Sequence, residues 1–478
     1  MSTSAMPTAE RETPRWARYL PGWWRLRHYS IGWLRGDVIA GLAVAAYLVP
    51  QVMAYAELAG LSAVQGLWAA VGPLLVYAIL GSSRQLSIGP ESTTALMTAV
   101  GIAAVTHGNP ALAATAAAAL AVTVGLLCVV GWLGRLGYVA DLLSKPVLTG
   151  YMAGIAALMI VSQLGKITGM SVPSGSSRSE VAYVVTHLDQ IEPATVILAT
   201  AVVVLLFVGR AIRPGLPWVL FVMVASAAAV AVLGANRFGL AVVGTIPRGL
   251  PVPSLPDFAG LNPLDVSLAA VGIAAVGFTD NVLTARAFAS RRGEQIDASQ
   301  ELLALGVANV SSSLLQGFPV SSSGSRTAVI DSSGGRSQVA GLTALAVIVA
   351  TLLFLGPVLA LFPLAALGGV VVYAATRLVD LAGFRRLRHF RVSELVLALV
   401  TTVAVLAVDV LYGIAIAIGL SVLNLLRRIA RPHDAILGFA PGVAGMHDID
   451  DYPDATLVPG LLVYRYDAPL FFADANDF

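Results

Sequence analysis

Apolar runs long enough to cross a membrane as helices recur along almost the whole chain. A helix needs about 20 mostly apolar residues to span the roughly 30 Å hydrocarbon core of a bilayer. Only 12% of the residues are charged and 57% are hydrophobic, whereas about a quarter of the residues of a soluble protein are charged. So few charges cannot cover a water-facing surface of this size, and we therefore expect an integral membrane protein.

Polar breaks divide these runs into fourteen predicted helices. Cytoplasmic loops should be rich in Arg and Lys, and fourteen crossings place the basic leader, the arginine-rich loops and the segment after the last helix in the cytoplasm. We therefore expect a multi-pass membrane protein with both termini cytoplasmic. The predicted helices lie near 37–56, 64–81, 90–105, 111–134, 146–165, 193–209, 216–234, 264–285, 297–316, 320–333, 338–355, 358–376, 393–409 and 412–427.

Two of the predicted helices are abnormal. GPESTTALMTAV opens a short helix at Pro90, and PVSSSGSRTAVIDSSGG at 319–335 is shorter still and can hardly span a membrane alone. They are third and tenth in the series, so each is the third member of its half of seven. Interrupted helices at matching places in two halves indicate an inverted-repeat transporter, in which the two helix starts meet near the bilayer midplane.

The same pattern divides the chain into four parts. A basic cytoplasmic segment covers 1–36, the first seven-helix repeat covers 37–235, and the second covers 264–430. After Arg431 the composition changes, and 431–478 alternates in polarity and is rich in β-forming residues. We expect a cytoplasmic linker there, followed by the opening strands of a soluble domain that is too short to build its own core.

An arginine in the tenth predicted helix is the most informative single residue. A charge at membrane depth costs roughly 2.5–3.5 kcal/mol on insertion scales and is by default a functional hypothesis. Arg326 also lies near a helix start, at the wrong end of the helix dipole for a cation. Either an acid (Asp280, Glu91 or Asp331) compensates it permanently, or a transported anion does. In the second case, neighbouring hydroxyl and backbone N–H groups would be donors, with Ser321, Ser322, Ser323 and Ser325 as the side chains.

Two acids and a polar pair accompany this arginine. Glu91 either caps the third helix, because an acid suits a first turn, or binds a proton in a buried setting. Asp280 and Thr284 are one turn apart and together can hold a cation or a proton. The alternative for Asp280 is a salt bridge to the arginine. Gln51 and Tyr55, also one turn apart, either pack in the ordinary way or contact a substrate.

Several motifs in series resemble the SulP sulfate permeases, prokaryotic relatives of the vertebrate sulfate/anion exchangers that include prestin. VPQVMAYAELAGLSAVQGLWAAVGPLLVYAILGSSRQLSIGPESTTALM is similar to their first three helices, and FTDNVLTARAFASRRGEQIDASQELLALGVANVSSSLLQGFPVSSSGSRTAV to their eighth to tenth. The resemblance covers residues 31–478, and it implies a location in a bacterial inner (plasma) membrane. It implies an all-α membrane fold of two inverted seven-helix repeats with core and gate domains. It also implies that the third and tenth helices are half-helices after short strands, of which RQLSIG is the first.

The resemblance also implies which residues form the site. Gln51, Tyr55, Ser92, Ser325 and Arg326 match family positions that line the anion site, and the pair on the eighth helix matches positions that bind Na+ in bicarbonate-carrying members. Where some vertebrate members have an aromatic residue, this chain has an acid, which favours proton coupling. The candidate anion-binding residues are Gln51, Tyr55, Ser92, Thr93, Ser323, Ser325 and Arg326. The candidates for the coupling ion are Glu91, Asp280 and Thr284, with Na+ at Asp280 and Thr284 as the one metal considered.

These features predict a secondary active transporter of a small inorganic oxyanion, sulfate first, that works by alternating access and is coupled to H+ or Na+. Bicarbonate/Na+ symport and dicarboxylate/H+ symport are the alternatives within the fold. A nucleobase–cation symporter is disfavoured because Arg326 replaces its second acid, and a channel or voltage-responsive motor stays open. An intramembrane enzyme is disfavoured because the sequence has no HExxH motif and places no His at membrane depth.

The partners follow from the same reasoning. We expect a small anion, a coupling cation, membrane lipid and, as in the family, a second copy of the chain. We expect no nucleic-acid partner, because the formal charge is only +2, and we expect no cofactor. Family members usually end in a cytoplasmic STAS domain. LVYRYDAPLFFADANDF resembles its first strand region only, so an incomplete STAS domain is expected.

Overall fold

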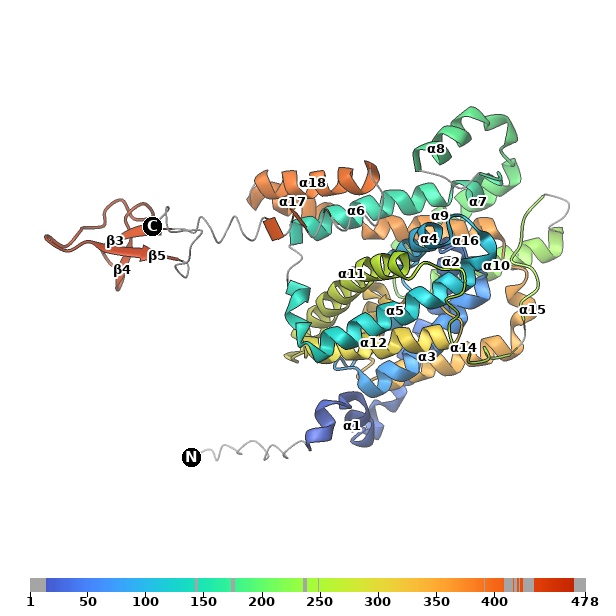
Figure 1. The fold of residues 1–478 in the computed structure, drawn as a ribbon, viewed down its shortest axis with the longest axis horizontal. Coiled ribbons are helices and arrows are strands. Elements are labelled where there is room, and N and C mark those ends of the chain that lie inside the picture. The colour runs from blue at the N-terminus through green and yellow to red at the C-terminus, as the bar shows by residue number, and fades with distance from the viewer. Residues whose placement is uncertain are drawn as a thin grey trace. The chain divides into compact units, whose positions relative to one another are not determined.

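The computed structural model describes residues 14–141, 145–172, 177–234, 239–247, 249–390, 392–407 and 434–467, together with a few isolated positions between 416 and 423. The chain forms two compact units, of which the first runs to Ile416 and the second begins at Ala417. The first unit is helical and the second contains a small sheet (Figure 1).

Thirteen of the fourteen predicted membrane helices are present as helices, and the fourteenth, at 412–427, falls where only isolated positions are described. Seven helices in the described part are long and apolar enough to cross a membrane by themselves. The thirteen are α2 (Leu34–Leu58), α3 (Ala63–Leu80), α4 (Ser92–Thr106), α5 (Ala113–Leu133), α6 (Lys145–Ser162), α9 (Pro193–Ile212), α10 (Trp218–Leu233), α11 (Pro263–Ala289), α12 (Ala298–Leu314), α13 (Gly324–Ser332), α14 (Val339–Phe354), α16 (Leu364–Leu378) and α18 (Val392–Ala407).

Shorter helices lie where the sequence predicts loops and the leader. They were not predicted because hydropathy detects only segments that can span a bilayer. The α-helices among them are α1 (Pro21–Arg27), α7 (Leu164–Thr168), α8 (Ser177–Thr186), α15 (Gly356–Leu359) and α17 (Leu381–Phe390). The 3₁₀ helices are η1 (Arg15–Arg18), η2 (Ile31–Trp33), η3 (Pro110–Leu112), η4 (Leu136–Asp141), η5 (Leu188–Gln190) and η7 (Ser290–Arg292).

A two-stranded ladder joins the two halves of the first unit. Strand β1 (Ile88–Gly89) pairs antiparallel with β2 (Ser321–Ser322), and each strand leads into one of the short helices, α4 or α13. The strands expected before the half-helices are therefore present. The first is shorter than RQLSIG, because only its last two residues pair. One more backbone bond, from Ser323 N to Ser87 O at 3.0 Å, extends the contact.

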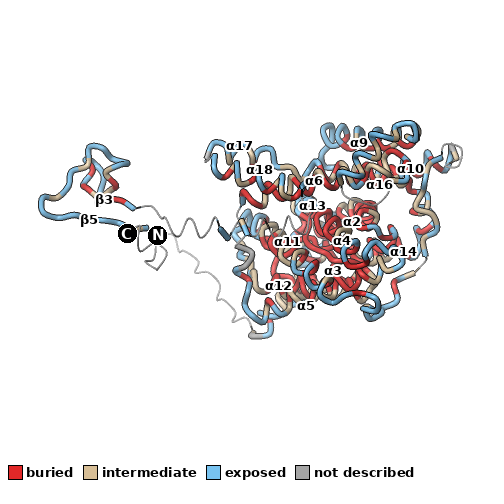
Figure 2. Tube along the Cα trace, turned by 45° about the horizontal axis from the view of Figure 1, so that its top comes forward, coloured by how far each residue is buried: buried red, intermediate tan, exposed pale blue. Residues whose placement is uncertain are grey.

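Packing divides the membrane helices of the first unit into two groups. In the first, α12 packs on α5 and α3, α14 packs on α2 and α3, and α11 packs on α5 and α4. In the second, α18 packs on α6, while α16 packs on α9 and α6. Helix α10 packs on α9 and so belongs to the second group. Helix α2 belongs to the first group and contacts the second through α10 and α16. This division agrees with the expected core and gate domains, and Figure 2 shows the buried segments gathered around α2, α4 and α13.

Small residues let the helices of the first group approach closely. A Cβ at Gly125 of α5 would lie 2.7 Å from the carbonyl oxygen of Gly306 in α12, and one at Gly306 would lie 2.8 Å from the oxygen of Gly125. Membrane helices gain no hydrophobic driving force from one another, so they pack through such small residues. Any larger side chain at either glycine would push α5 and α12 apart.

The second unit holds a three-stranded antiparallel sheet in the order β4-β3-β5. The strands are β3 (Asp434–Phe439), β4 (Met446–Asp448) and β5 (Val463–Tyr466). Opening strands were predicted in this part of the chain, and β5 falls within the alternating segment that suggested them. Residues 468–478, the rest of that segment, lie outside the described residues.

Candidate functional site

The two half-helices begin beside the same strand pair. Glu91 is the N-cap of α4 and accepts a hydrogen bond from the backbone nitrogen of Thr93 at 2.7 Å. Ser323 is the N-cap of α13, and its hydroxyl accepts from the backbone nitrogen of Arg326 at 3.5 Å. The first-turn N–H groups of a helix carry a positive partial charge. Two such starts therefore lie close to one another inside the bundle.

Arg326, the third residue of α13, is completely buried. Its Nε donates to the hydroxyl of Ser87 at 3.2 Å, and its Nη1 donates to the carbonyl oxygen of Pro90 at 2.7 Å and to Oε1 of Gln51 at 3.4 Å. Its Nη2 is buried and has no hydrogen-bond partner in the described structure. An unpaired buried donor on a charged group is costly, so this nitrogen marks a place where a ligand atom would be stabilised.

The acids considered as permanent partners of Arg326 are engaged elsewhere. Asp331 pairs with Arg292 at 2.6 Å. Glu91 accepts from the first turn of α4, including the Ser92 hydroxyl. Within the described part of the chain, no carboxylate oxygen lies within 4.0 Å of the Arg326 guanidinium, so the salt bridge to Asp280 that the sequence left open is not formed here.

Helix α2 contributes one face to the site. Gln51 is buried and links Tyr55 to Arg326. Its Nε2 donates to the Tyr55 hydroxyl at 2.8 Å, and its Oε1 accepts from Arg326. Tyr47, one turn earlier, lies close to Ser325 and Arg326. Sequence reasoning missed Tyr47, although its spacing of four residues from Gln51 is the signal that could have found it.

The start of α13 is partly open. Ser325 and Gly324 are exposed, whereas Ser323 and Arg326 are buried. The hydroxyls of Ser323 and Ser325 lie 3.1 Å apart. An opening at the helix start with a cation behind it is the geometry in which an anion can approach N–H groups and guanidinium together. Helix α11 borders this opening, because a Cβ at Gly324 would come within 3.9 Å of the Thr284 methyl carbon.

Asp280 has neighbours other than those of the arginine. It is half-buried on α11, one turn before Thr284, and its carboxylate neighbours Ser322 of β2 and Glu91. Two carboxylates close together repel when both are ionised, so such a pair favours a shared proton or a bound cation. The structure thus brings the three coupling candidates to one place.

Thr93 is the candidate least suited to binding an anion. Its hydroxyl faces α6 and lies 3.8 Å from the sulfur of Met152, while its backbone nitrogen is capped by Glu91. Ser92 is buried and donates to the same carboxylate. Ser87 and the carbonyl of Pro90, by contrast, hold the arginine although the sequence did not single them out as ligands. Nothing in a linear pattern shows that a backbone oxygen will face a distant guanidinium.

Known proteins resemble this chain in sequence over most of its length. The profile of the Sulfate permease family matches residues 34–401. A probable sulfate transporter of Mycobacterium tuberculosis is 54% identical over 462 residues, which cover 97% of this chain and 82% of that protein. Human solute carrier family 26 member 6 is 32% identical over 482 residues, covering 95% of this chain and 63% of that protein.

Solved structures share the architecture. Murine solute carrier 26 family member A9, an anion transporter in the inward-facing state, has a TM-score of 0.85 at 24% identity and covers 99% of this chain and 82% of its own. The transmembrane domain of the bicarbonate transporter BicA from a cyanobacterium has a TM-score of 0.72 at 22% identity and covers 82% of this chain and 98% of its own. These likenesses establish the fold.

Proposed function

The chain belongs to the sulfate permease family, and from that premise we propose that it is a secondary active transporter of a small oxyanion, sulfate first, that works by alternating access. Its relatives are named as sulfate transporters and solute carriers, and anion transport is the activity the family supports. The apolar helices make it a multi-pass membrane protein. The further steps concern the anion, the coupling ion and the movement.

The observation that carries this proposal is the unpaired Nη2 of Arg326. A fully buried guanidinium without a carboxylate in reach lacks a counter-charge, and a buried charge is stable only when it is paired and hydrogen-bonded. An oxyanion supplies several acceptor oxygens at once. Its negative charge also suits the dipoles of both half-helices.

The groups around this nitrogen are donors of the kind that recognise sulfate. The planar guanidinium presents its N–H groups as a fork that matches two oxygens of an oxyanion. The exposed hydroxyl of Ser325 and the first-turn N–H groups of α13 are further donors at the opening. Gln51 accepts from the arginine and donates to the Tyr55 hydroxyl, so these two residues of α2 define the back of the site.

Glu91 and Asp280 support coupling to a cation, and we favour H+. When both acids are ionised, bringing a sulfate near Glu91 costs repulsion, whereas one proton on the pair removes part of it. Binding of proton and anion would therefore help one another. Na+ at Asp280 and Thr284 is the alternative, because a carboxylate and a hydroxyl one turn apart provide oxygen ligands.

Alternating access would be a movement of the core helices against the gate helices. The anion candidates lie on α2, α4 and α13 of the core, and α2 also contacts α10 and α16 of the gate. A shift at these contacts would expose the start of α13 first to one side of the membrane and then to the other. Such relative motion of two bundles around a fixed site is the usual mechanism of transporters with inverted repeats.

Uptake by proteoliposomes tests the proposal. Labelled sulfate should accumulate in vesicles that contain the protein, the uptake should follow an inward proton gradient, and unlabelled sulfate should compete. Arg326→Ala should abolish uptake, whereas Arg213→Ala, an exposed arginine outside the site, should leave it intact. Uptake of sulfate that Arg326→Ala does not diminish would overturn the role given to the arginine.

The same assay separates the nearest alternatives. Sodium-dependent bicarbonate uptake with no sulfate uptake would identify a bicarbonate/Na+ symporter, which the Asp280–Thr284 pair can accommodate. Proton-dependent uptake of a dicarboxylate would identify the third candidate. If the protein passes an anion current, but no ion gradient makes the anion accumulate against its own electrochemical gradient, the protein is a channel.

A further inference from the structure

A large cavity lies apart from the half-helices, at the end of the bundle where the N-terminal segment packs. Its volume is about 870 Å³, which falls within the range of small-molecule sites. Its walls come from the end of η1, the ends of α5 and α11, and the start of α12. Helix η4 also contributes to the wall, through Gly137 and Tyr138.

Positive charge dominates this cavity. Arg18, Arg135 and Arg286 line it against a single acid, Asp297. The Asp297 carboxylate is engaged as the N-cap of α12, where it accepts from the backbone nitrogens of Ser299 and Gln300 at 2.9 and 3.1 Å. Arg18 and Arg135 form neither an ion pair nor a side-chain hydrogen bond within the described ranges. Arg18 and Arg135 therefore offer positive charge that is available to an anion.

Arg135 is also held in an unfavourable backbone conformation. Its φ is +55°, in the left-handed region that non-glycine residues seldom adopt. Such a conformation is strained, and strained residues cluster at functional sites. A glycine could adopt the same backbone conformation without strain. The arginine at this position therefore contributes through its side chain.

An exposed apolar track leads from this cavity along α5. Leu126, Val130 and Leu133 are spaced by four and three residues, so they share one face of the helix, and they are 54%, 62% and 67% exposed. In a membrane protein such a face contacts acyl chains. Because Leu133 also lines the cavity, a molecule with an anionic head and an apolar tail could occupy cavity and track together.

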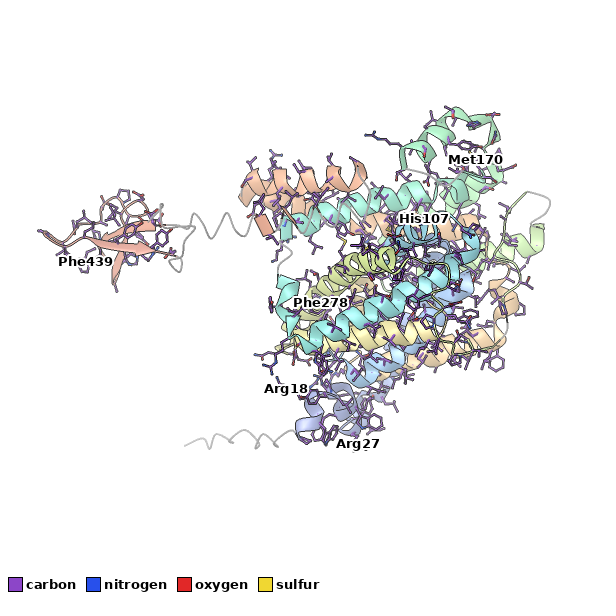
Figure 3. All side chains as sticks on the ribbon, viewed as in Figure 1. Arg18, Arg27, His107, Met170, Phe278 and Phe439 are labelled. Carbon is purple, nitrogen blue, oxygen red and sulfur yellow. The ribbon has the colours of Figure 1, made fainter. Side chains whose placement is uncertain are left out.

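The cavity lies at the arginine-rich side of the first unit. Figure 3 places Arg18 and Arg27 together and well apart from His107, which lies in a predicted outer hairpin. Anionic phospholipids concentrate in the cytoplasmic leaflet and attract basic residues at its surface. Aromatic residues mark the same depth, since Tyr19 and Trp132 meet edge to face at 6.2 Å between ring centres.

We propose that this cavity binds the phosphate headgroup of an anionic phospholipid from the cytoplasmic leaflet. Arg18 and Arg135 grip the phosphate, and the acyl chains lie along Leu126, Val130 and Leu133. The lipid joins the N-terminal segment to the core helices, beside the existing bonds from Gln300 Nε2 to the carbonyl oxygens of Tyr19 and Leu80.

Thermal unfolding of the purified protein in neutral detergent tests this inference without any transport measurement. Dioctanoyl phosphatidylglycerol should raise the melting temperature of the parent in a saturable way, while dioctanoyl phosphatidylcholine should not. Arg135→Gly should melt no lower than the parent without lipid, because it relieves the backbone strain, yet its apparent affinity for phosphatidylglycerol should fall about tenfold or more. Arg18→Ala should show a similar loss, and Arg213→Ala should behave as the parent.

Three results would overturn the inference. Equal stabilisation by phosphatidylcholine would show that the headgroup charge is not recognised. Equal stabilisation by inorganic phosphate at matched concentration would identify a site for a soluble anion instead of a lipid. If neither Arg135→Gly nor Arg18→Ala lowers the affinity for phosphatidylglycerol, the lipid binds elsewhere. The same conclusion follows if Arg213→Ala lowers the affinity equally.

Discussion

Nη1 of Arg326 donates a hydrogen bond to the carbonyl oxygen of Pro90 at 2.7 Å. The third residue of one half-helix is thereby tied to the residue before the N-cap of the other. The Arg326 Nε bond to Ser87 reinforces this tie, and so does the β1–β2 pairing. The same guanidinium thus links the two inverted halves and offers its Nη2 to a ligand. A substitution of Arg326 therefore affects both the contact between the halves and the binding of a ligand.

Arg326→Ala should weaken sulfate binding more than it destabilises the fold. A charge-assisted hydrogen bond contributes roughly 1.5–3 kcal/mol, so the affinity should fall about tenfold to a hundredfold. Arg326→Lys should recover only part, because an ammonium lacks the planar fork. Equilibrium titration of the purified protein with sulfate measures this, with Arg292→Ala as control because Arg292 pairs with Asp331 instead. Parent-like affinity together with a much lower melting temperature would make Arg326 a structural residue.

Gly89→Ala should remove the stabilisation that sulfate confers. Gly89 has φ +152°, and a Cβ there would lie 3.5 Å from Nη2 of Arg326, in the space proposed for the anion. Gly108→Ala is the matched control, since Gly108 also has a positive φ (+81°) but open space around it. Both variants should lose about 1–3 kcal/mol of stability through backbone strain. Only Gly89→Ala should also lose the rise in melting temperature with sulfate; an equal response in both variants would contradict the assignment.

Asp280→Asn and Glu91→Gln should alter coupling while sparing the anion site. Asp280 makes no ion pair with Arg326 in this structure, so Asp280→Asn should leave sulfate affinity within about twofold of the parent. It should nevertheless abolish the dependence of uptake on the cation gradient. Glu91→Gln keeps an oxygen that can cap α4 and should flatten the dependence of uptake on pH. If Asp280→Asn lowers the sulfate affinity, Asp280 acts instead as a structural partner of Arg326.

The helices of this fold could be predicted because each one satisfies its own backbone hydrogen bonds. Inside a bilayer no water can replace these bonds, so membrane depth appears in the sequence as local apolar runs, and thirteen of the predicted runs are helices here. The half-helices were equally visible, because Pro90 and the serine-rich segment at 319–335 interrupt otherwise apolar sequence.

The detailed contacts of the site could not be predicted, because they depend on pairing between distant segments. The β1–β2 register decides that Ser87 and the Pro90 carbonyl, instead of Asp280, face Arg326. A pattern of residue types indicates that Asp280 and Arg326 lie at similar depth, but it does not show which groups each of them contacts. The residue roles in transport stay predictions that the variants above test.

Glu301 is a buried acid away from the candidate anion site. It is completely buried in α12. Its carboxylate accepts from the Tyr77 hydroxyl at 2.9 Å, from the backbone nitrogen and hydroxyl of Ser82 at 2.9 and 2.7 Å, and from Nδ2 of Asn281 at 2.8 Å. These donors join α3, the turn after it, and α11. Glu301 thereby holds these core elements together through hydrogen bonds.

Tyr77→Phe should therefore destabilise the protein by about 1.5–3 kcal/mol, the cost of losing a hydrogen bond to a charged group. Glu301→Gln should cost more, because the amide nitrogen of glutamine turns a donor toward donors that need an acceptor. Both variants should retain the sulfate affinity of the parent, since Glu301 contacts neither Arg326 nor the start of α13. Thermal unfolding and sulfate titration of the same samples measure the two effects, with Tyr183→Phe as a control tyrosine outside the network. A variant that loses sulfate affinity while keeping its melting temperature would instead connect Glu301 to the anion site.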